Sequence, residues 1–517
     1  MRSVGCYAAV MAAVAGSILG GAPRVRAGNP LKIMPLGDSI TNGNNGYVSY
    51  RYPLYYRLQA DGYTNYTFVG TQQTTNDDSL IKTTDYPRYN IDFPKANEGH
   101  QGYYALTIAN QITSWASSTQ PDVVLLMAGL NDLIGYASDE NGVITSYKSI
   151  IANLRAVNPP IVVLVAKLTP AAWYNVNTLN TLIGQQIPQL TTSQSPVMVV
   201  DQYTGFDPST MQVDGVHPNL AGGQFMSDRW APVLESVLPV AAGQVVTISA
   251  ALVGAQGPIK SGGGTMKLLG ANTYTGIGGT VVNGGTLVFG APNTRPTGDV
   301  LTLGKDTTLT PAGAMVVLNT GETMAQVRAE LQAGTIKAAI GAAGVRQGVG
   351  YLTTDQYNAL HGANFATGGV VAKYTYLGDA TLKGYIDAGD YAQLDVAWMK
   401  GIYDGKHLDN QNHVIMASWN NGDFDYNGLI TANDFAILDA AYTLSHGGTL
   451  ANDPLYAGHL ATFGAGYADL VAAQQGMAAV PEPGTLALLA GGLALALGRK
   501  SRRDGGPPPP HPRYERK

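Results

Sequence analysis

The sequence predicts an α/β fold in residues 28–240, built on a doubly wound parallel sheet and followed by a β-rich spacer and a small α-helical module. Two observations predict the α/β part. Strand-like and helix-like patterns alternate along residues 28–240, as a doubly wound sheet requires. The strand-like runs are continuously apolar rather than alternating, which is typical of parallel strands that helices cover on both faces.

The elements of this α/β segment follow from their side chains. Short runs rich in branched and apolar side chains predict four buried strands, at residues 31–36, 123–127, 161–165 and 197–200. Helical patterns predict helices at residues 53–59, 104–116, 144–157, 176–190 and 221–238. Open α/β sheets bind ligands at the carboxyl ends of their strands, so the residues that follow these strands are expected to form the site.

Three polar residues in this segment predict hydrolytic chemistry. Ser39 follows the first predicted strand in the run Gly-Asp-Ser, and Asp214 opens the segment Asp-Gly-Val-His-Pro-Asn, which contains His217. A serine hydroxyl becomes a good nucleophile only when a neighbouring base takes its proton. We therefore expect His217 to take the Ser39 proton and return it to an alcohol leaving group, while Asp214 orients the imidazole. The alternatives are structural, with Ser39 as a helix cap and Asp214 as a turn cap.

Acyl transfer also needs hydrogen-bond donors for the oxyanion of the tetrahedral intermediate, each contributing roughly 3 to 4 kcal/mol. Gly102 ends the run Glu-Gly-His-Gln-Gly and offers a backbone N–H that can approach closely, and Asn131 follows the second predicted strand. These two residues are the predicted donors. His100, Asp38 and Asp132 lie beside them in the sequence but have no task in this chemistry, so we expect them to be structural.

The chain order of Ser39, Gly102, Asn131 and His217 resembles the four sequence blocks of the SGNH or GDSL hydrolase superfamily. Closer matches resemble carbohydrate esterase family three, the acetyl xylan esterases, over about residues 30–238. These matches are residues 35–43, 52–54, 62–63, 68–70, 98–102, 121–132 and 214–219.

The resemblance implies a flavodoxin-like three-layer fold and an esterase that needs no cofactor for catalysis. It implies Ser39 as the nucleophile, His217 as the base and Asp214 as the residue that orients the base. It also implies that the Ser39 amide joins Gly102 and Asn131 as oxyanion donors.

The sequence predicts the reaction more firmly than the substrate, because Met-Ala-Gly-Leu at residues 127–130 replaces the family's commoner threonine-bearing run. The leading hypothesis is a secreted serine esterase that removes acyl groups, above all acetyl, from polysaccharide such as xylan. One alternative keeps the serine chemistry but acts on another O-acetylated sugar or on a lipid, as a lipase or lysophospholipase does. The other alternative is a non-enzymatic surface scaffold or adhesin.

Composition bounds the class of protein. At 517 residues the chain predicts about three domains of roughly 150 residues each. A net charge of -5 without a basic patch excludes nucleic acid as a partner. The single cysteine, Cys6, lies in residues 1–27, which predict a secretory signal peptide, with an uncleaved anchor as the alternative. The mature chain then has no cysteine, so its stability is expected to come from packed cores, with bound metal as a further source, rather than from disulfides.

Residues 241–370 predict a β-rich spacer. Gly, Thr, Val and Asn dominate up to about residue 320, where short alternating strands separated by glycine turns are expected. The clearest copy, residues 279–290, resembles the strand repeat of autotransporter passenger domains. We interpret this segment as structural, with ligand binding as the alternative.

Two loops in the predicted helical module, residues 371–446, have the pattern of calcium loops. The second loop, residues 423–434, offers oxygen ligands at positions 1, 3, 5, 7, 9 and 12 and has glycine at position 6. Its predicted ligands are Asp423, Asp425, Asn427, the carbonyl of Leu429, Thr431 and Asp434. The first loop, residues 379–390, has the same frame. Its predicted ligands are Asp379, Thr381, Tyr385, Asp387 and Asp390.

The first loop is expected to bind calcium weakly, because Thr381 and Lys383 stand where better ligands are usual. Helical patterns follow the loops at residues 391–400 and 435–444, and aspartate at position 12 makes the pair resemble dockerin type I repeats. The wide spacing between the loops argues against a cohesin partner. The alternative interpretation is two aspartate-rich surface turns.

The C-terminal part predicts a sorting signal. A Pro-Glu-Pro motif, an uncharged apolar run and a basic cluster follow one another along residues 481–503. This order resembles a PEP-CTERM signal, which implies an exosortase-type processing enzyme and a protein that is secreted or associated with the cell envelope. The apolar run is shorter than the ~20 residues of a full membrane span. Residues 447–480 predict a linker, and the proline-rich tail, residues 504–517, predicts disorder.

Overall fold

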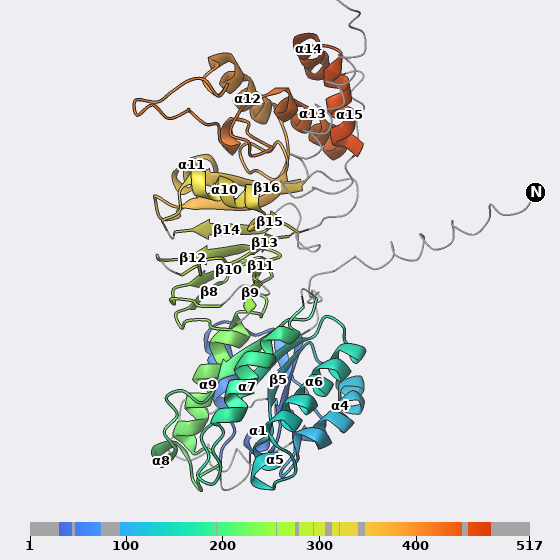
Figure 1. The fold of residues 1–517 in the computed structure, drawn as a ribbon, viewed down its shortest axis with the longest axis vertical. Coiled ribbons are helices and arrows are strands. Elements are labelled where there is room, and N and C mark those ends of the chain that lie inside the picture. Colours follow the sequence, from blue (N-terminus) through green and yellow to red (C-terminus); the bar gives the residue numbers. More distant parts are fainter. Residues whose placement is uncertain are drawn as a thin grey trace, which may run out of the picture. The chain divides into compact units, whose positions relative to one another are not determined.

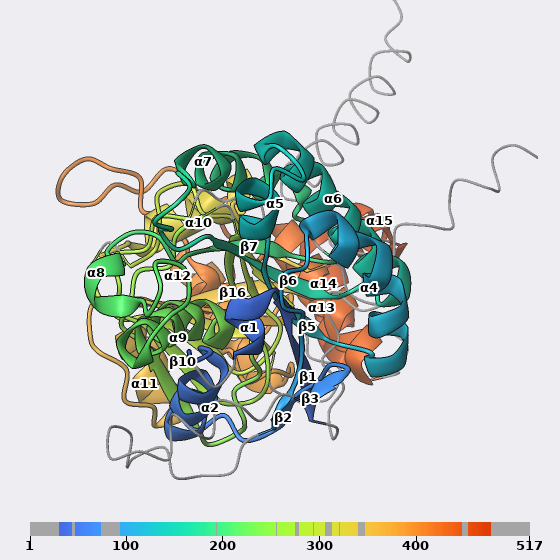
Figure 2. The ribbon, with the colours of Figure 1, turned by 90° about the horizontal axis from the view of Figure 1, so that it is seen from below.

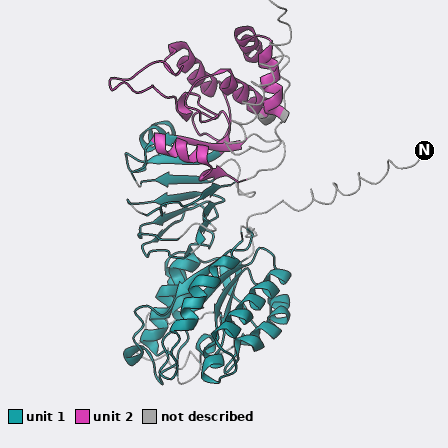
Figure 3. Cartoon of the chain, viewed as in Figure 1, with its two compact units in different colours: residues 1–323, 352–374 teal, residues 324–351, 375–517 magenta. Residues whose placement is uncertain are grey.

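The structure is a computed structural model of the 517-residue chain. It describes residues 30–43, 47–73, 94–192, 194–254, 256–274, 279–292, 294–304, 313–319, 321–339, 347–446 and 453–476 (Figure 1). The expected signal peptide, the PEP-CTERM-like segment and the tail lie outside the described residues. The chain divides into two compact units, residues 1–323 with 352–374 and residues 324–351 with 375–517 (Figure 3).

The first unit begins with a seven-stranded, mostly parallel sheet. Its strands are β1 (Leu31–Gly37), β2 (Tyr66–Phe68), β3 (Gln72–Gln73), β4 (Ala96–Gly99), β5 (Val123–Met127), β6 (Val162–Lys167) and β7 (Val197–Asp201). The order is β3-β4-β1-β5-β6-β7, with β2 paired to the start of β1 and β4 to its end. Of the described pairings in this sheet, β3–β4 alone is antiparallel. The predicted α/β class with a parallel sheet is confirmed.

Helices cover both faces of this sheet. They are α1 (Ser39–Asn42), α2 (Arg51–Ala60), α4 (Ala105–Thr119), α5 (Leu130–Ile134), α6 (Glu140–Val157), α7 (Asn177–Gln186), the 3-10 turn η2 (Pro188–Leu190), α8 (Pro208–Met211) and α9 (Leu220–Glu235). Helix α4 packs against α6, and α2 packs against α9 (Figure 2). The central strand β5 is buried along its whole length, which explains its uninterrupted apolar sequence.

The sequence predicted four strands of this sheet and missed three short ones. Strand β4 was missed because its run Ala-Asn-Glu-Gly is polar, although Asn97 and Glu98 are fully buried. Buried polar side chains persist only where hydrogen bonds satisfy them. Glu98 accepts the Thr71 backbone N–H at 2.8 Å and its hydroxyl at 2.6 Å, and the Asn97 carboxamide oxygen accepts the Gly99 N–H at 2.9 Å.

The first unit continues as a ladder of short parallel strands, the β-rich segment that the sequence predicts. These strands are β8 (Val245–Ile248), β9 (Gln256–Lys260), β10 (Thr265–Leu268), β11 (Gly279–Val282), β12 (Thr286–Phe289), β13 (Leu301–Leu303) and β14 (Met315–Leu318). Strands β8, β10, β12 and β14 stack in register in one sheet, while β9, β11 and β13 stack in another. The chain therefore coils, and each coil adds one strand to each sheet. Strand β17 (Val370–Tyr376) then pairs with β14 in antiparallel fashion.

The turns of these coils are held by buried polar side chains. Lys260 is fully buried, and its ammonium donates to the carbonyl oxygens of Ser261 at 2.8 Å, Gly262 at 2.6 Å and Gly284 at 2.9 Å. The last of these bonds joins one coil to the next. Asn272 joins neighbouring coils in the same way, because it accepts the N–H of Leu252 and donates to the carbonyl of Thr294.

The remaining elements are mostly helical. They are α10 (Met324–Ala333), β15 (Ile336–Ala338), β16 (Gln347–Thr353), α11 (Thr354–His361), α12 (Ala388–Lys400), the 3-10 turn η3 (Trp419–Asn421), α13 (Ala432–His446), α14 (Pro454–Phe463) and α15 (Gly466–Gly476). Helices α14 and α15 lie where the sequence predicted a linker. They pack with α13, whose buried Asp439 accepts hydrogen bonds from Tyr391 and Tyr467. Among the described residues, no helix combines the length and apolar character needed to cross a membrane.

Candidate functional site

The predicted catalytic residues lie at one edge of the first sheet. Strands β4, β1 and β5 are parallel neighbours, and their last residues pair in register, with Gly37 opposite both Gly99 and Met127. Their carboxyl ends therefore share one edge. The segments that leave this edge carry Ser39 after β1, Gly102 after β4 and Asn131 after β5.

Ser39 is the first residue of the short helix α1. Asp38 caps this helix, because its carboxylate accepts the Ile40 N–H at 3.0 Å. The Ser39 side-chain oxygen lies 2.8 Å from Nε2 of His217. The predicted nucleophile and the predicted base, which are far apart in sequence, are thus within hydrogen-bonding distance.

Asp214 holds the His217 ring from the other side. One carboxylate oxygen lies 2.7 Å from Nδ1 of His217, and the other accepts the backbone N–H groups of His217 at 2.8 Å and Val216 at 3.0 Å. With the Nδ1 proton directed at the carboxylate, Nε2 is left to accept the Ser39 proton. Partial burial opposes ionisation of Asp214, but the hydrogen bonds from His217 and Val216 outweigh it and lower its pKa. The carboxylate is therefore charged at neutral pH.

Tyr47 is a site residue that the sequence did not indicate. Its ring stacks on the His217 imidazole, with 3.9 Å between ring centroids and 18° between planes. A backbone hydrogen bond joins the residues that follow the two rings, since the Val48 N–H donates to the Pro218 carbonyl at 3.1 Å. The stacking restricts rotation of the imidazole. No motif surrounds Tyr47, so only the tertiary structure reveals this contact.

Gly102 and Asn131, the predicted oxyanion donors, are joined through the residue after Gly102. The side-chain amide of Asn131 donates to the Tyr103 carbonyl at 3.1 Å, which fixes the orientation of that amide. Gly102 has a φ of 76°, a left-handed conformation that favours glycine. A Cβ at Gly102 would meet no atom within 4 Å, so its backbone faces open space.

His100, Asp38 and Asp132 have the structural surroundings that the sequence analysis expected. His100 lies 2.7 Å from the buried Glu98 carboxylate and stacks on Trp115, with ring centroids 4.4 Å apart. Asp132 accepts the Ala105 N–H at 2.8 Å and so fixes the start of α4. Burial raises the pKa of Asp132, and it raises the pKa of Asp38 to about 7.

Arg51 is a second residue that sequence reasoning missed. Its guanidinium is fully buried and donates to the carbonyl oxygens of Thr41 at 2.9 Å, Asn42 at 2.8 Å and Lys95 at 3.0 Å. Two of these carbonyls belong to α1, the helix that starts at Ser39. Arg51 therefore ties the helix of the predicted nucleophile to the chain that enters β4.

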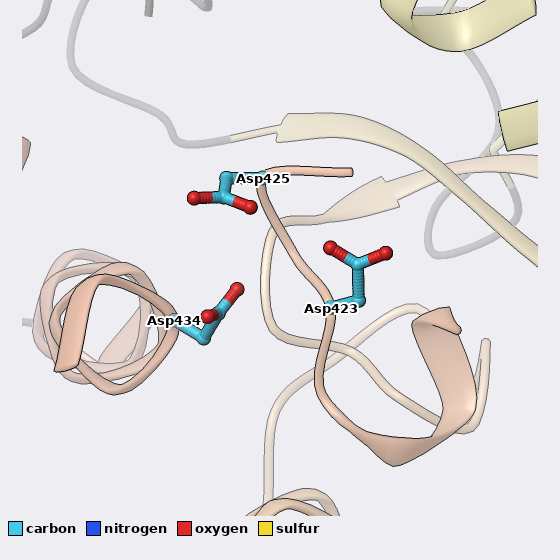
Figure 4. Close-up of side chains that lie close together, drawn as sticks. All are labelled: Asp423, Asp425 and Asp434. Carbon is cyan, nitrogen blue, oxygen red and sulfur yellow. The ribbon is translucent and has the colours of Figure 1, made fainter. Parts of the chain in front are cut away.

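In the second unit, the second loop gathers three carboxylates. Side-chain oxygens of Asp423, Asp425 and Asp434 lie within 4.8 Å of one another (Figure 4). Phe424 N–H donates to Asp434 at 2.9 Å, and Asn433 donates to Asp425 at 2.8 Å. Three like charges at this separation repel strongly unless they are protonated or share a cation.

Asp423 differs from its two neighbours because both of its carboxylate oxygens are buried and have no hydrogen-bond partner among the described residues. The backbone N–H groups of Asn427 and Gly428 favour its charged form, but neither completes a hydrogen bond with it. Burial raises the pKa of Asp423 to about 7 and raises that of Asp434 as well. The nearby Arg328 guanidinium also favours the charged form of Asp423, but among the described residues no group forms a hydrogen bond with this buried carboxylate, which is costly and makes Asp423 a sign that a further cation is needed.

The other predicted side-chain ligands of this loop, Asn427 and Thr431, contact its aspartates. Asn427 donates to Asp425 at 2.9 Å and accepts the Leu429 N–H at 2.7 Å. The Thr431 hydroxyl donates to Asp434 at 3.0 Å. The second loop therefore brings its predicted side-chain ligands to one place.

The first loop, whose predicted ligands are Asp379, Thr381, Tyr385, Asp387 and Asp390, gathers them in part, since the Thr381 hydroxyl donates to Asp390 at 3.0 Å, and calcium binding there stays a prediction. The only cluster of three metal-binding side chains found among the described residues is that of the second loop. In the first loop the ammonium of Lys383 lies 2.6 Å from Asp387 and 3.6 Å from Asp390. A lysine thus occupies the side of the loop where the sequence pattern placed a metal.

Comparison with known proteins assigns three segments of the chain. Residues 36–225 match the GDSL-like Lipase/Acylhydrolase family, residues 259–289 match the Passenger-associated-transport-repeat, and residues 479–503 match the PEP-CTERM protein-sorting motif.

One relative is a multidomain esterase of Ruminococcus flavefaciens, 29 % identical over 251 residues that make up 44 % of this chain and 31 % of the relative. The chain therefore matches about a third of that relative's length. A carbohydrate esterase family 3 structure from Talaromyces cellulolyticus is 32 % identical and covers 40 % of this chain and 96 % of its own, with a TM-score of 0.35. A family 3 carbohydrate esterase of Clostridium thermocellum is 30 % identical, with coverages of 39 % and 94 % and a TM-score of 0.34.

Proposed function

Because residues 36–225 form a domain of the GDSL-like lipase/acylhydrolase family, we propose that this protein is a serine esterase that removes acetyl groups from polysaccharide such as xylan. The observation that carries the proposal is the chain of contacts from Ser39 through His217 to Asp214, with 2.8 Å and 2.7 Å at its two steps. This is the arrangement that acyl transfer by a serine requires.

In the proposed reaction, the Ser39 oxygen attacks the acyl carbonyl while its proton passes to Nε2 of His217. Asp214 stabilises the imidazolium that forms, and Tyr47 keeps the ring in plane. The carbonyl oxygen becomes an oxyanion, toward which the N–H groups of Ser39, Gly102 and the Asn131 side chain donate.

Collapse of this intermediate breaks the bond to the alcohol oxygen, which takes the proton back from the imidazolium and leaves as the free hydroxyl of the sugar. Water then attacks the acyl-serine by the same route, with the imidazole again as base. The products are acetate and the regenerated serine hydroxyl.

Acetylated polysaccharide is the proposed substrate because the sequence blocks around the site resemble carbohydrate esterase family three, and the relative named as a multidomain esterase supports the ester chemistry. The second candidate keeps the same serine chemistry but takes a lipid ester, which the family description allows. A scaffold without activity is the third candidate. The positioned triad argues against it.

The test uses the purified full chain with 4-nitrophenyl acetate, acetylated xylan and a lysophospholipid. We expect acetate release from the first two, with little fatty acid from the third. Ser39→Ala should lower kcat by about 10⁴-fold or more, whereas Ser117→Ala, at an exposed serine of α4, should leave it unchanged. Full activity of Ser39→Ala would reject the mechanism. Preference for the lysophospholipid would keep the mechanism and change the substrate.

We also propose that the protein is exported and processed by an exosortase-type enzyme. The PEP-CTERM match at residues 479–503 and the passenger-type repeat at residues 259–289 support this placement at the cell envelope. When the protein is produced in a bacterial host, deletion of residues 481–503 should change the cell fraction, such as envelope or medium, in which the protein accumulates. An unchanged distribution in cell fractionation would contradict the proposal.

We propose, further, that the second loop binds calcium. Ca²⁺ prefers oxygen ligands. The loop presents Asp423, Asp425, Asn427, Thr431 and Asp434 in the order of a calcium loop, and their three carboxylates lie close together. Asp423 has no hydrogen-bond partner among the described residues, and a bound cation would stabilise its charge. Isothermal titration calorimetry of the chelator-treated full chain should detect binding. Asp423→Asn should abolish it, and binding that survives this change would refute the assignment.

A further inference from the structure

The two loops of the second unit share one backbone frame. At position 4 both have a non-glycine residue with positive φ, Leu382 at 58° and Tyr426 at 62°. At position 6 both have a glycine with positive φ, Gly384 at 95° and Gly428 at 79°. Positive φ is uncommon in residues other than glycine, so its recurrence at the same position shows that both loops wrap in the same way.

The last carboxylate of each loop is held alike. Asp390 accepts the Asp387 N–H at 2.9 Å, and Asp434 accepts the Thr431 N–H at 2.9 Å, in both cases from position 9 to position 12. Any difference between the loops in what they bind therefore comes from their side chains rather than from their backbone.

The loops differ at position 5. The first has Lys383 there, and the second has Asn427. The Lys383 ammonium lies 2.6 Å from Asp387 and 3.6 Å from Asp390, and its side chain is only 23 % exposed. It thus contacts the carboxylates of positions 9 and 12, two of the groups that a calcium ion would need.

The loops also differ at position 1. Asp379 accepts the backbone N–H groups of Lys383 at 3.0 Å and Gly384 at 2.7 Å, together with the Thr375 hydroxyl. Asp423, its counterpart, is buried and has no hydrogen-bond partner within the described part of the chain. The first loop is therefore satisfied by its own chain, whereas the second is not.

We propose that the Lys383 ammonium takes the place of a metal ion in the first loop, so that the two loops together bind one divalent cation, held by the second loop. The inference rests on the calcium site proposed above for the second loop. The ammonium supplies a positive charge and N–H donors to Asp387 and Asp390, and it repels a further cation that approaches the same carboxylates.

The experiment counts calcium ions per chain by equilibrium dialysis of the chelator-treated full chain. The wild type should bind one. Lys383→Asn, which installs the residue that the second loop has at position 5, should bind two. Lys400→Asn, at an exposed lysine of α12, controls for loss of one positive charge and should bind one.

Two further variants separate this inference from the calcium proposal. Asp423→Asn should bind none, and Asp423→Asn combined with Lys383→Asn should bind one, at the first loop. Two ions on the wild type, or one ion on Lys383→Asn with unchanged circular dichroism, would overturn the role of Lys383. If Lys383→Asn loses helical signal, Lys383→Gln is counted instead. No ion on the wild type would overturn the calcium proposal, and none on Lys383→Asn as well would overturn both.

Discussion

Asp214 at the edge of the first sheet and Asp423 in the second loop are both candidate functional carboxylates, yet their surroundings are opposite. Asp214 receives three hydrogen bonds, from the backbone and ring of His217 and from the Val216 N–H, and its pKa is lowered. Asp423 receives no hydrogen bond from any residue that the structure describes, and burial raises its pKa to about 7. The first carboxylate has hydrogen-bond donors from its own chain, whereas no described residue forms a hydrogen bond with the second.

The difference teaches what each region needs in order to act. A serine hydrolase site moves protons among its own side chains, so its carboxylate must already be charged and oriented in the folded chain. A cation site has its charge completed from outside, so one of its ligands is left unpartnered until the ion arrives. Hydrogen-bond donors around a carboxylate therefore distinguish the two kinds of site better than its burial does.

The largest effect should come from breaking the first region at Asp214. Asp214→Asn keeps an oxygen for the backbone N–H groups of Val216 and His217 but removes the charge and offers an N–H to Nδ1 of His217. The ring then presents the wrong tautomer to Ser39, and kcat on 4-nitrophenyl acetate should fall by about 10³- to 10⁴-fold with KM little changed.

Steady-state kinetics measure this loss, and Asp228→Asn, at an exposed aspartate of α9, is the matched control. Should Asp214→Asn retain more than about a tenth of the wild-type kcat, the orienting role of Asp214 would be wrong.

A smaller effect, on the pH dependence of stability, is expected at Asp38, which is a third carboxylate to compare with Asp214 and Asp423. Asp38 is buried beside Ser39, and burial raises the pKa of Asp38 from 3.8 to about 7. Between these values the folded chain holds a proton that the unfolded chain has lost. The free energy of unfolding therefore decreases as pH rises from about 4 to about 7, by a few kcal/mol at most, at about 1.4 kcal/mol per pKa unit. Asp38→Asn keeps the acceptor for the Ile40 N–H and should remove this dependence.

Denaturant unfolding of the full chain at several pH values measures the slope, with Asp228→Asn again as control. An identical slope in wild type and Asp38→Asn would show that Asp38 does not titrate in this range.

Much of the first sheet could be predicted from the sequence because its central strands are apolar throughout. Strand β5 was predicted with its observed ends, since every side chain in it is buried. The meeting of Ser39 with His217 was also expected, because the loops that leave the carboxyl ends of parallel strands share one edge. Their catalytic roles stay predictions until activity is measured.

What the sequence did not predict depends on contacts between distant side chains. Tyr47 stacks on His217 and Arg51 ties α1 to the chain before β4, but neither lies in a recognisable motif. The loop pattern identified Lys383 as a poor calcium ligand, yet its pairing with Asp387 follows only from the folded loop. A sequence motif predicts the backbone conformation of a loop, whereas its ion pairs depend on the direction in which each side chain points in the folded loop.

The coiled ladder from β8 to β14 has a consequence for how this chain varies over evolution. Within the ladder a strand pairs with the strands one coil before and one coil after it, as β12 does with β10 and β14, and β14 at its end pairs with β17. Gain or loss of a whole coil therefore leaves every other register intact, and it alters the height of the ladder by about 4.8 Å. Descendants of this protein can adjust that height stepwise while the hydrolase domain stays unchanged.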